Sequence, residues 1–321
     1  MRIWKLLLVA CIVMVSLLAV GGLAVATPFS DTPANVAKGG QLYDKWWVAA
    51  GVAQPQGDHP LWATQTTNTR KGLDTWRCKE CHGWDYKGKD GAYGSGSHKT
   101  GFVGVVDASK NKTVEQIVAI LKGAGNPKHN FSPALNDASL GALASFIKEG
   151  IVPDLTQNID YATKKPIGGD AAKGKELFTS RCVACHAADG MKLNFGSAEA
   201  PEFVGTIAAD NPQEFLHKVR AGQPGAPMPS GFETNLTLAD AVNILAYAQS
   251  LPAKPATAAP APTAAAAPAQ PAPAVAAATQ LPRTGESGLP VLPIAVAGLL
   301  LVAGGWTVRN LHRGRLKGLS G

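Results

Sequence analysis

The chain has 321 residues and a formal net charge of +7 at pH 7, from 30 Lys and Arg against 23 Asp and Glu. Most of that excess lies at the two ends: residues 1–26 carry two basic residues, and residues 281–321 carry five basic residues and one acidic residue. Residues 27–280 hold 23 basic and 22 acidic residues, a net charge of only +1. The composition therefore argues against a nucleic-acid-binding protein, because the basic residues mark the chain ends and not a folded surface.

The first 26 residues are an apolar run behind a basic start. Arg2 and Lys5 open it, and Ala24-Val25-Ala26 has the A-x-A form of a signal-peptidase site. We predict a signal peptide over 1–26 and export of the chain. An uncleaved N-terminal anchor is the alternative, because the run is long enough to cross a bilayer.

The four cysteines after the leader form two copies of one motif, at residues 78–82 and 182–186. Cys-x-x-Cys-His is the haem-attachment signature, in which two thiols bond the vinyl groups of one haem and the His becomes the proximal iron ligand. A Cys₄ zinc site, a redox disulfide or structural disulfides would leave both histidines unexplained. We therefore predict two covalent haem c groups. The predicted attachment residues and proximal ligands are Cys78, Cys81 and His82, then Cys182, Cys185 and His186.

The sequence around the second motif resembles a known family. Residues 170–190, DAAKGKELFTSRCVACHAADG, are similar to the opening of a class I bacterial cytochrome c domain. The resemblance implies a mainly α fold, with one helix leading into the motif, two more wrapping the haem, and the distal ligand in a loop before the last helix. We expect two tandem cytochrome c-like helical domains, each around one covalent haem, at 27–150 and 170–251, joined by a linker over 151–169.

The first domain repeats the outline of the second. Residues 38–43, KGGQLY, echo residues 173–178, KGKELF. A second helix is expected over 113–123, and a last helix from near Asn136 to Gly150.

The first domain needs a distal ligand other than methionine, because residues 27–190 contain none. His129 stands six residues after a helix-terminating glycine, just as Met228 does in the second domain. We therefore predict His129 as the distal ligand; His98, in a glycine-rich stretch ahead of the second helix, and an open site are the alternatives. Two further histidines, expected on the surface, are His59 and His217.

The first domain also carries an insertion ahead of its motif. Gly39 precedes Cys78 by 39 residues, whereas Gly174 precedes Cys182 by 8. We expect this segment to form an aromatic lid over the haem edge, and a partner-docking patch is the alternative. The tryptophans concerned are Trp46, Trp47, Trp62 and Trp76.

The second domain has clear helix signals over 211–222 and 237–252. Between them, Met228 lies in the segment Ala-Pro-Met-Pro at 226–229, where two prolines would hold the loop rigid. The family position implies that Met228 is the distal ligand, which gives a His/Met haem. Ordinary core packing is the alternative for this methionine.

The C-terminal part contains a stalk and an anchor signal. In residues 252–280, 22 of 29 positions are Ala or Pro, which predicts a disordered, semi-rigid stalk. Residues 281–321 hold the motif LPRTG, an apolar segment over 289–308 and a basic tail. This order resembles a sortase cell-surface sorting signal, cut in that family between Thr284 and Gly285. A retained transmembrane anchor over 289–308 is the alternative, and both readings place the haem domains outside the cytoplasm.

These features predict a non-catalytic electron carrier: an extracytoplasmic dihaem cytochrome c, anchored to the membrane or cell surface, with redox proteins as partners. A haem subunit of a respiratory or terminal oxidase complex and a dihaem peroxidase-like oxidoreductase are the alternatives. A His/Met iron favours the ferrous state more than a bis-His iron does, so we expect electrons to pass from the first haem to the second.

Overall fold

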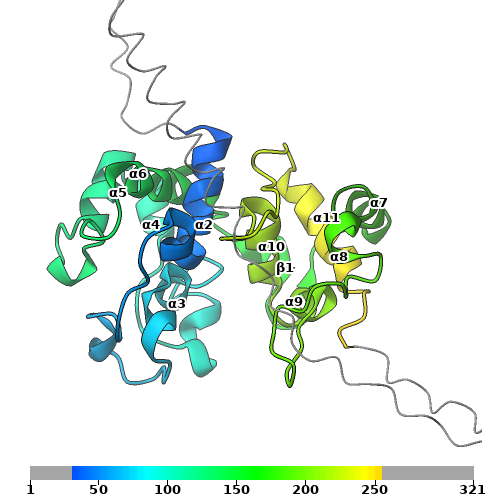
Figure 1. Ribbon diagram of the computed structural model, residues 1–321, viewed down its shortest axis with the longest axis horizontal. Helices are drawn as coiled ribbons and strands as arrows, with labels where there is room; N and C mark the ends of the chain where they lie inside the picture. The colour runs from blue at the N-terminus through cyan, green and yellow to red at the C-terminus, as the bar shows by residue number, and fades with distance from the viewer. Residues whose placement is uncertain (1–30, 255–321) are drawn as a thin grey trace, which may run out of the picture. The chain divides into compact units, whose positions relative to one another are not determined.

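The computed structural model describes residues 31–254, so the leader, most of the stalk, the sorting motif and the segment 289–308 fall outside the described range. The described chain is helix-rich, with one short antiparallel pair of strands (Figure 1). The expectation of a mainly α chain is confirmed here. None of the helices within 31–254 is both long and apolar enough to span a bilayer.

The first region, residues 31–150, starts with a long helix, α2 (Pro33–Ala50). Thr32 caps it by accepting a hydrogen bond from the Asn35 N–H at 3.3 Å, and Pro33 occupies the first turn. The remaining helices of this region are α3 (Cys78–His82), α4 (Val106–Asn111), α5 (Val114–Leu121), α6 (Asp137–Ser145) and a π-helical continuation, η6 (Phe146–Gly150). Short 3₁₀ turns are η1 (Trp62–Thr64), η2 (Gly72–Trp76), η3 (Ala92–Gly94), η4 (Gly96–His98) and η5 (Pro127–His129).

Side-chain caps fix where the predicted helices begin. Thr113 and Gln116 form a reciprocal capping box at α5, and the Asn136 side chain accepts from the Ser139 N–H at the start of α6. The helices expected over 113–123 and from Asn136 to Gly150 are therefore confirmed in outline.

The second region, residues 170–251, has the same order of elements. Its helices are α7 (Ala171–Arg181), α8 (Val183–His186), α9 (Val204–Asp210), α10 (Pro212–Ala221) and α11 (Leu238–Ala248). Asn211 caps α10, and Thr237 with Asp240 forms a capping box at α11. The last helix ends at Ala248, short of the predicted Pro252, because a residue before proline avoids the helical conformation and the chain turns first.

Both regions share a close crossing between their first and last helices. Gly39 of α2 lies against the backbone of α6, and Gly174 of α7 lies against the backbone of α11. A Cβ atom at either glycine would overlap a carbonyl oxygen of the partner helix. The echo between residues 38–43 and 173–178 is therefore explained by packing, since only glycine permits this approach.

The segment predicted as a linker is folded. It contains a 3₁₀ turn, η7 (Leu155–Gln157), and the paired strands β1 (Ile159–Asp160) and β2 (Lys165–Pro166). Leu155 and Ile159 are 1% and 0% exposed and belong to a buried apolar cluster that also includes residues of both helical regions. Residues 151–169 are therefore part of the core, because their apolar side chains are buried against it.

The insertion does not expose its tryptophans. Trp46 and Trp47 lie on α2 itself, with ring centroids 5.4 Å apart, and Trp62 is also buried. The Trp46 indole N–H donates to the carbonyl oxygen of Trp76 at 3.0 Å. The alternative of an aromatic docking patch is therefore wrong for these residues, because the rings bury their faces against the core.

Candidate functional site

The first motif forms α3, a single turn that ends at Gly83, whose φ is 78°. This turn brings Cys78, Cys81 and His82 to one cavity edge. Burial raises the pKa of the Cys78 thiol to about 12, and burial also raises the pKa of Cys81. Both thiols are unpaired, and within 31–254 no cluster of three or more His, Cys, Asp or Glu is arranged to hold a metal ion. The Cys₄ zinc alternative is therefore wrong.

The His82 ring is held in one tautomer by the backbone. Its Nδ1 lies 2.7 Å from the carbonyl oxygen of Val103, and a carbonyl only accepts, so Nδ1 carries the proton. Nε2 is then the acceptor nitrogen, free to bind a metal, which is the arrangement that metal-binding histidines adopt. Burial, followed by the neighbouring His129, lowers the pKa of His82 to about 4, so the ring is neutral as ligation requires.

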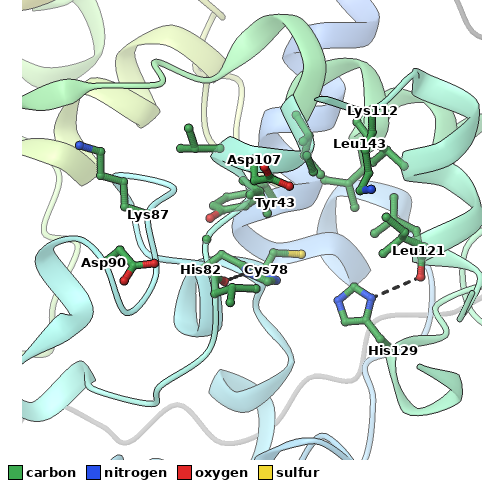
Figure 2. A pocket seen from close by; sticks show the side chains of 18 residues that line it. Tyr43, Cys78, His82, Lys87, Asp90, Asp107, Lys112, Leu121, His129 and Leu143 are labelled. Atoms are coloured by element: carbon green, nitrogen blue, oxygen red, sulfur yellow. Dashed lines mark hydrogen bonds between the residues drawn. The ribbon is translucent and has the colours of Figure 1, made fainter. Parts of the chain in front are cut away.

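His129 faces the same cavity from η5 (Figure 2). Its Nδ1 points to the carbonyl oxygen of Ile120 at 3.4 Å, and burial lowers its pKa. The ring centroids of His82 and His129 are 6.2 Å apart and the ring planes are nearly perpendicular, at 85°. A metal bound about 2.0 Å from each Nε2, with about 1.1 Å from nitrogen to ring centre, requires about 6.2 Å between centroids. The distance between the two ring centres is therefore compatible with an iron held between two imidazoles.

The space beside these rings suits a flat apolar cofactor. One cavity of about 690 Å³ and another of about 420 Å³ both have Cys78, His82 and His129 in their walls. Each is within the size of typical cofactor pockets. Two cations, Lys87 and Lys112, stand at the wall of the larger cavity. Its apolar wall consists mainly of Val103, Val105, Ile117, Leu121, Leu143 and Ile147.

His98 has neither ring nitrogen to spare. Nδ1 lies 3.1 Å from Oε1 of Glu80, Nε2 lies 3.0 Å from the guanidinium of Arg70, and the ring stacks on Tyr93 at 4.3 Å. His98 does not line either cavity. In this geometry His98 braces the attachment turn through Glu80.

Glu80 is a supporting residue that the sequence did not reveal. It occupies a variable position of the motif, yet its side chain is fully buried and paired with Arg70 at 3.1 Å and Lys79 at 2.7 Å. Burial raises the pKa of Glu80, but hydrogen bonding from His98 and the charge of Lys79 outweigh it and lower the pKa to about 2. The only available signal was a charged residue between the two cysteines, which does not identify partners distant in sequence.

His59 was expected on the surface, and this is wrong. The residue is 6% exposed and lines the smaller cavity together with Cys81 and His129. Its ring packs edge-on against Trp76 at 4.6 Å, and its Nδ1 accepts the Leu61 N–H at 3.1 Å. The insertion therefore reaches the cavity, with both His59 and Trp76 in the cavity wall.

The second motif is less enclosed than the first. Cys182 and His186 are half-buried, whereas Cys185 is exposed. The His186 ring lies 5.9 Å from Phe195, and its buried Nδ1 has no hydrogen-bond partner among the described residues. Buried polar atoms are normally paired. The His186 Nδ1 therefore lacks the kind of carbonyl partner that holds the His82 ring.

Met228 lies half-buried in the loop between α10 and α11. The loop returns onto α10, where the N–H groups of Gly231 and Phe232 donate to the carbonyl oxygens of Val219 and Arg220 at 3.1 and 3.0 Å. Gly222 permits the turn: its φ is 83°, and a Cβ there would lie 2.8 Å from the Met228 carbonyl oxygen.

Comparison with known proteins adds evidence for the second region. Residues 169–247 match the family model described as cytochrome c oxidase, cbb3-type, subunit III. The matched range contains the second motif and the Met228 loop. No curated protein and no solved structure matches the chain.

Proposed function

We propose that this chain, whose residues 169–247 form a c-type cytochrome domain, is a dihaem electron carrier that works outside the cytoplasm. The observation that carries the proposal for a haem at the first motif is the pair of His82 and His129, whose ring centroids lie 6.2 Å apart. Both rings line a cavity that also has Cys78 and Cys81 in its wall. Covalent attachment suits an exported carrier, because the cofactor cannot be lost by dissociation.

At the first site, Cys78 and Cys81 would hold the haem, and His82 and His129 would bind the iron. A bound haem supplies reversible one-electron chemistry at its iron. The chain contributes orientation: two backbone carbonyls fix both imidazole rings before the haem arrives. The apolar wall excludes water, and Lys112 in that wall would provide a cation for the carboxylates that a haem carries. The other cation, Lys87, is paired with Asp154 at 2.7 Å.

At the second site, Cys182 and Cys185 would hold the haem, with His186 and Met228 as axial ligands. The family match supports covalent haem here. The fold supports Met228 because its loop lies between the last two helices, which is where the resemblance to class I cytochromes c puts the distal ligand.

Side chains on both faces of each iron favour a carrier over a peroxidase. A peroxide-consuming iron needs one open position, whereas His129 would fill that position at the first site under this assignment. The second candidate function is a haem subunit of a respiratory oxidase complex, and the description of the matching family favours it. Co-purification of this chain with integral oxidase subunits from membranes would support that candidate.

The chain ends support a tethered carrier. The A-x-A leader over 1–26 would export the protein, and the LPRTG motif with the apolar segment 289–308 would retain it at the cell surface or in the membrane. A Thr284→Ala variant tests the sortase route. If a sortase acts, the variant should lose its cell-wall linkage and keep the uncleaved C-terminal tail. Unchanged anchoring, with the tail also retained in the wild type, would favour a transmembrane anchor.

Intact mass and EPR spectra of the exported protein test the haem assignment. Two covalent haems are expected, one with bis-imidazole and one with His/Met ligation. His129→Ala should convert the bis-imidazole signal to an open or water-bound iron, whereas His98→Ala should leave it unchanged. A mass with one haem, or a loss of the signal only in His98→Ala, would show the first-site assignment to be wrong.

A further inference from the structure

His217 of α10 is buried in a socket of aromatic rings from the first region. The residue is 2% exposed, which corrects its expected surface position. Its ring centroid lies 4.7 Å from Trp84, 5.5 Å from Phe146, 5.8 Å from Tyr43 and 6.1 Å from Tyr86. These four rings, called the aromatic socket below, all come from residues before 150, while His217 comes from the second region.

Both nitrogens of His217 are used across this contact. Burial lowers the pKa of His217 to about 3, so the ring is neutral and carries one proton. Nε2–H donates to the carbonyl oxygen of Gly40 at 3.0 Å, and Nδ1 accepts from the Tyr86 hydroxyl at 2.9 Å. Only one tautomer satisfies both bonds, so the ring orientation is fixed.

The next residue, Lys218, makes a buried ion pair at the edge of the socket. Its ammonium and the guanidinium of Arg77 both bond the carboxylate of Asp44, which is 1% exposed. Although burial alone would raise the pKa of Asp44, these two cations hold it well below its usual range. The carboxylate is therefore charged, and it joins the two cations from the two regions in one buried network.

This network connects the two proposed haem sites through the chain. Arg77 directly precedes Cys78, and Tyr43 of the socket lines the larger cavity of the first site (Figure 2). On the other side, Lys218 also donates to the Gln223 side chain at 2.6 Å, in the loop that leads to Met228. A second link is Gln41 of α2, which donates to the Ala221 carbonyl oxygen at 3.2 Å. The contact of α2 with α10 thus adjoins ligand-bearing segments of both sites (Figure 1).

We infer that His217 and Lys218 are positioning residues that dock the second haem region onto the first, so that electrons pass between the two haems within one rigid unit. This inference rests on the proposed function, because it assumes two haems. Regions joined in one chain move relative to each other unless their interface is large and well packed. The aromatic socket and the ion pair supply that packing, and residues of both lie next to the proposed haem sites.

Four variants of the full exported protein test the inference, and the fourth is the conservative Lys218→Arg. His217→Ala empties the socket, Lys218→Met removes one cation from Asp44, and Lys173→Met, on the exposed face of α7, removes a matched charge away from the contact. Docking is read by small-angle X-ray scattering and by protease sensitivity of residues 151–169. The rate of electron exchange between haems is read after a rapid pulse that reduces one of them.

In His217→Ala and Lys218→Met we expect a larger radius of gyration, faster cleavage at 151–169, and an interhaem rate lowered by about tenfold or more, the scale on which misplaced reacting centres lose rate. Lys173→Met and the conservative Lys218→Arg should retain wild-type values. Two results would overturn the inference. One is unchanged docking in both His217→Ala and Lys218→Met, and the other is lost docking with an unchanged rate of electron exchange. A mass showing a single haem would instead overturn the proposed function, while the docking measurements remain interpretable.

Discussion

The two helical regions share one plan but protect their motifs differently. In the first, the motif turn is braced by the buried Glu80, and the His82 ring is bonded to a backbone carbonyl. In the second, Cys185 is exposed and the His186 Nδ1 has no partner among the described residues. Two features of the first region account for this difference: the insertion, which has no counterpart before the second motif, and the Val103 carbonyl, which bonds the His82 ring.

The regions also differ in charge. Residues 31–150 contain 14 basic and 11 acidic residues, whereas residues 170–251 contain 6 basic and 9 acidic residues. Opposite net charge suits two different partners at the two ends of a relay, because charge complementarity governs encounter rates and partner choice. The two regions thus share one order of helices but differ in the sign of their net charge.

The largest expected effect comes from removing the attachment cysteines of one motif, because this should remove one of the two proposed haems. Cys78→Ala with Cys81→Ala should abolish the first covalent haem, and Cys182→Ala with Cys185→Ala should abolish the second, each halving the haem content by intact mass. The first pair should also destabilise its region more, because its cavity is lined by apolar side chains that a haem would cover. Equal thermal stability of the two variants would contradict the asymmetry.

Met228→His should make the two sites alike in ligation. A thioether is a weaker electron donor than imidazole, so the wild-type second haem should titrate at the higher potential. The substitution should lower that upper wave by about 100 mV, within the roughly 0.8 V range that axial ligands span. Potentiometric titration with optical detection measures both waves, and a fall in the lower wave would show that ligands and potentials are wrongly paired.

Asp44→Asn should destabilise the first region by about 3 kcal/mol at pH 7, because it leaves Lys218 and Arg77 without their buried counter-charge. The pKa of Asp44 is lowered in the folded chain, so its stabilising effect is complete above the ordinary Asp pKa of about 4 and is lost as pH falls below it. The wild type should therefore lose stability on acidification below about pH 4, and Asp44→Asn should lose less. The exposed Glu233→Gln serves as the control in urea titrations at both pH values.

Gly39→Ala and Gly174→Ala should each destabilise the chain by about 1–3 kcal/mol, because the added methyl forces the crossing helices apart. Similar losses in the two variants would support a shared crossing. Ala172→Leu, at an exposed position of α7, is the control for a larger side chain without a crossing. A stabilising effect of either glycine substitution, measured by thermal unfolding, would show that the helices are not in close contact.

Local signals in the sequence were sufficient for the helices and the two motifs. The helix starts expected near Thr113 and Thr237 are confirmed, and each threonine forms a capping box with the residue three positions on. The motifs required only five consecutive residues. Such features can be predicted because the residues that cause them lie within a few positions of one another in the sequence.

Features that depend on distant partners were not predictable in this way. His217 is polar on an amphipathic helix and so looked exposed, yet its partner Tyr86 is 131 residues away. Position in the chain favoured His129 over His98, but the sequence did not show that both ring nitrogens of His98 are already bonded, to Glu80 and Arg70. Residues 151–169 looked like a linker because their apolar positions are too few to form a periodic pattern.

The aromatic socket has a consequence for biogenesis. Its four rings belong to residues that are synthesised before α10, so the socket can form while the second region is still unfolded. The second region then completes its buried surface by inserting His217 into a surface already present. The first region would therefore fold before the second. A chain truncated after the first region would leave the aromatic socket unfilled, and a chain without the first region would leave His217 of α10 without its partners.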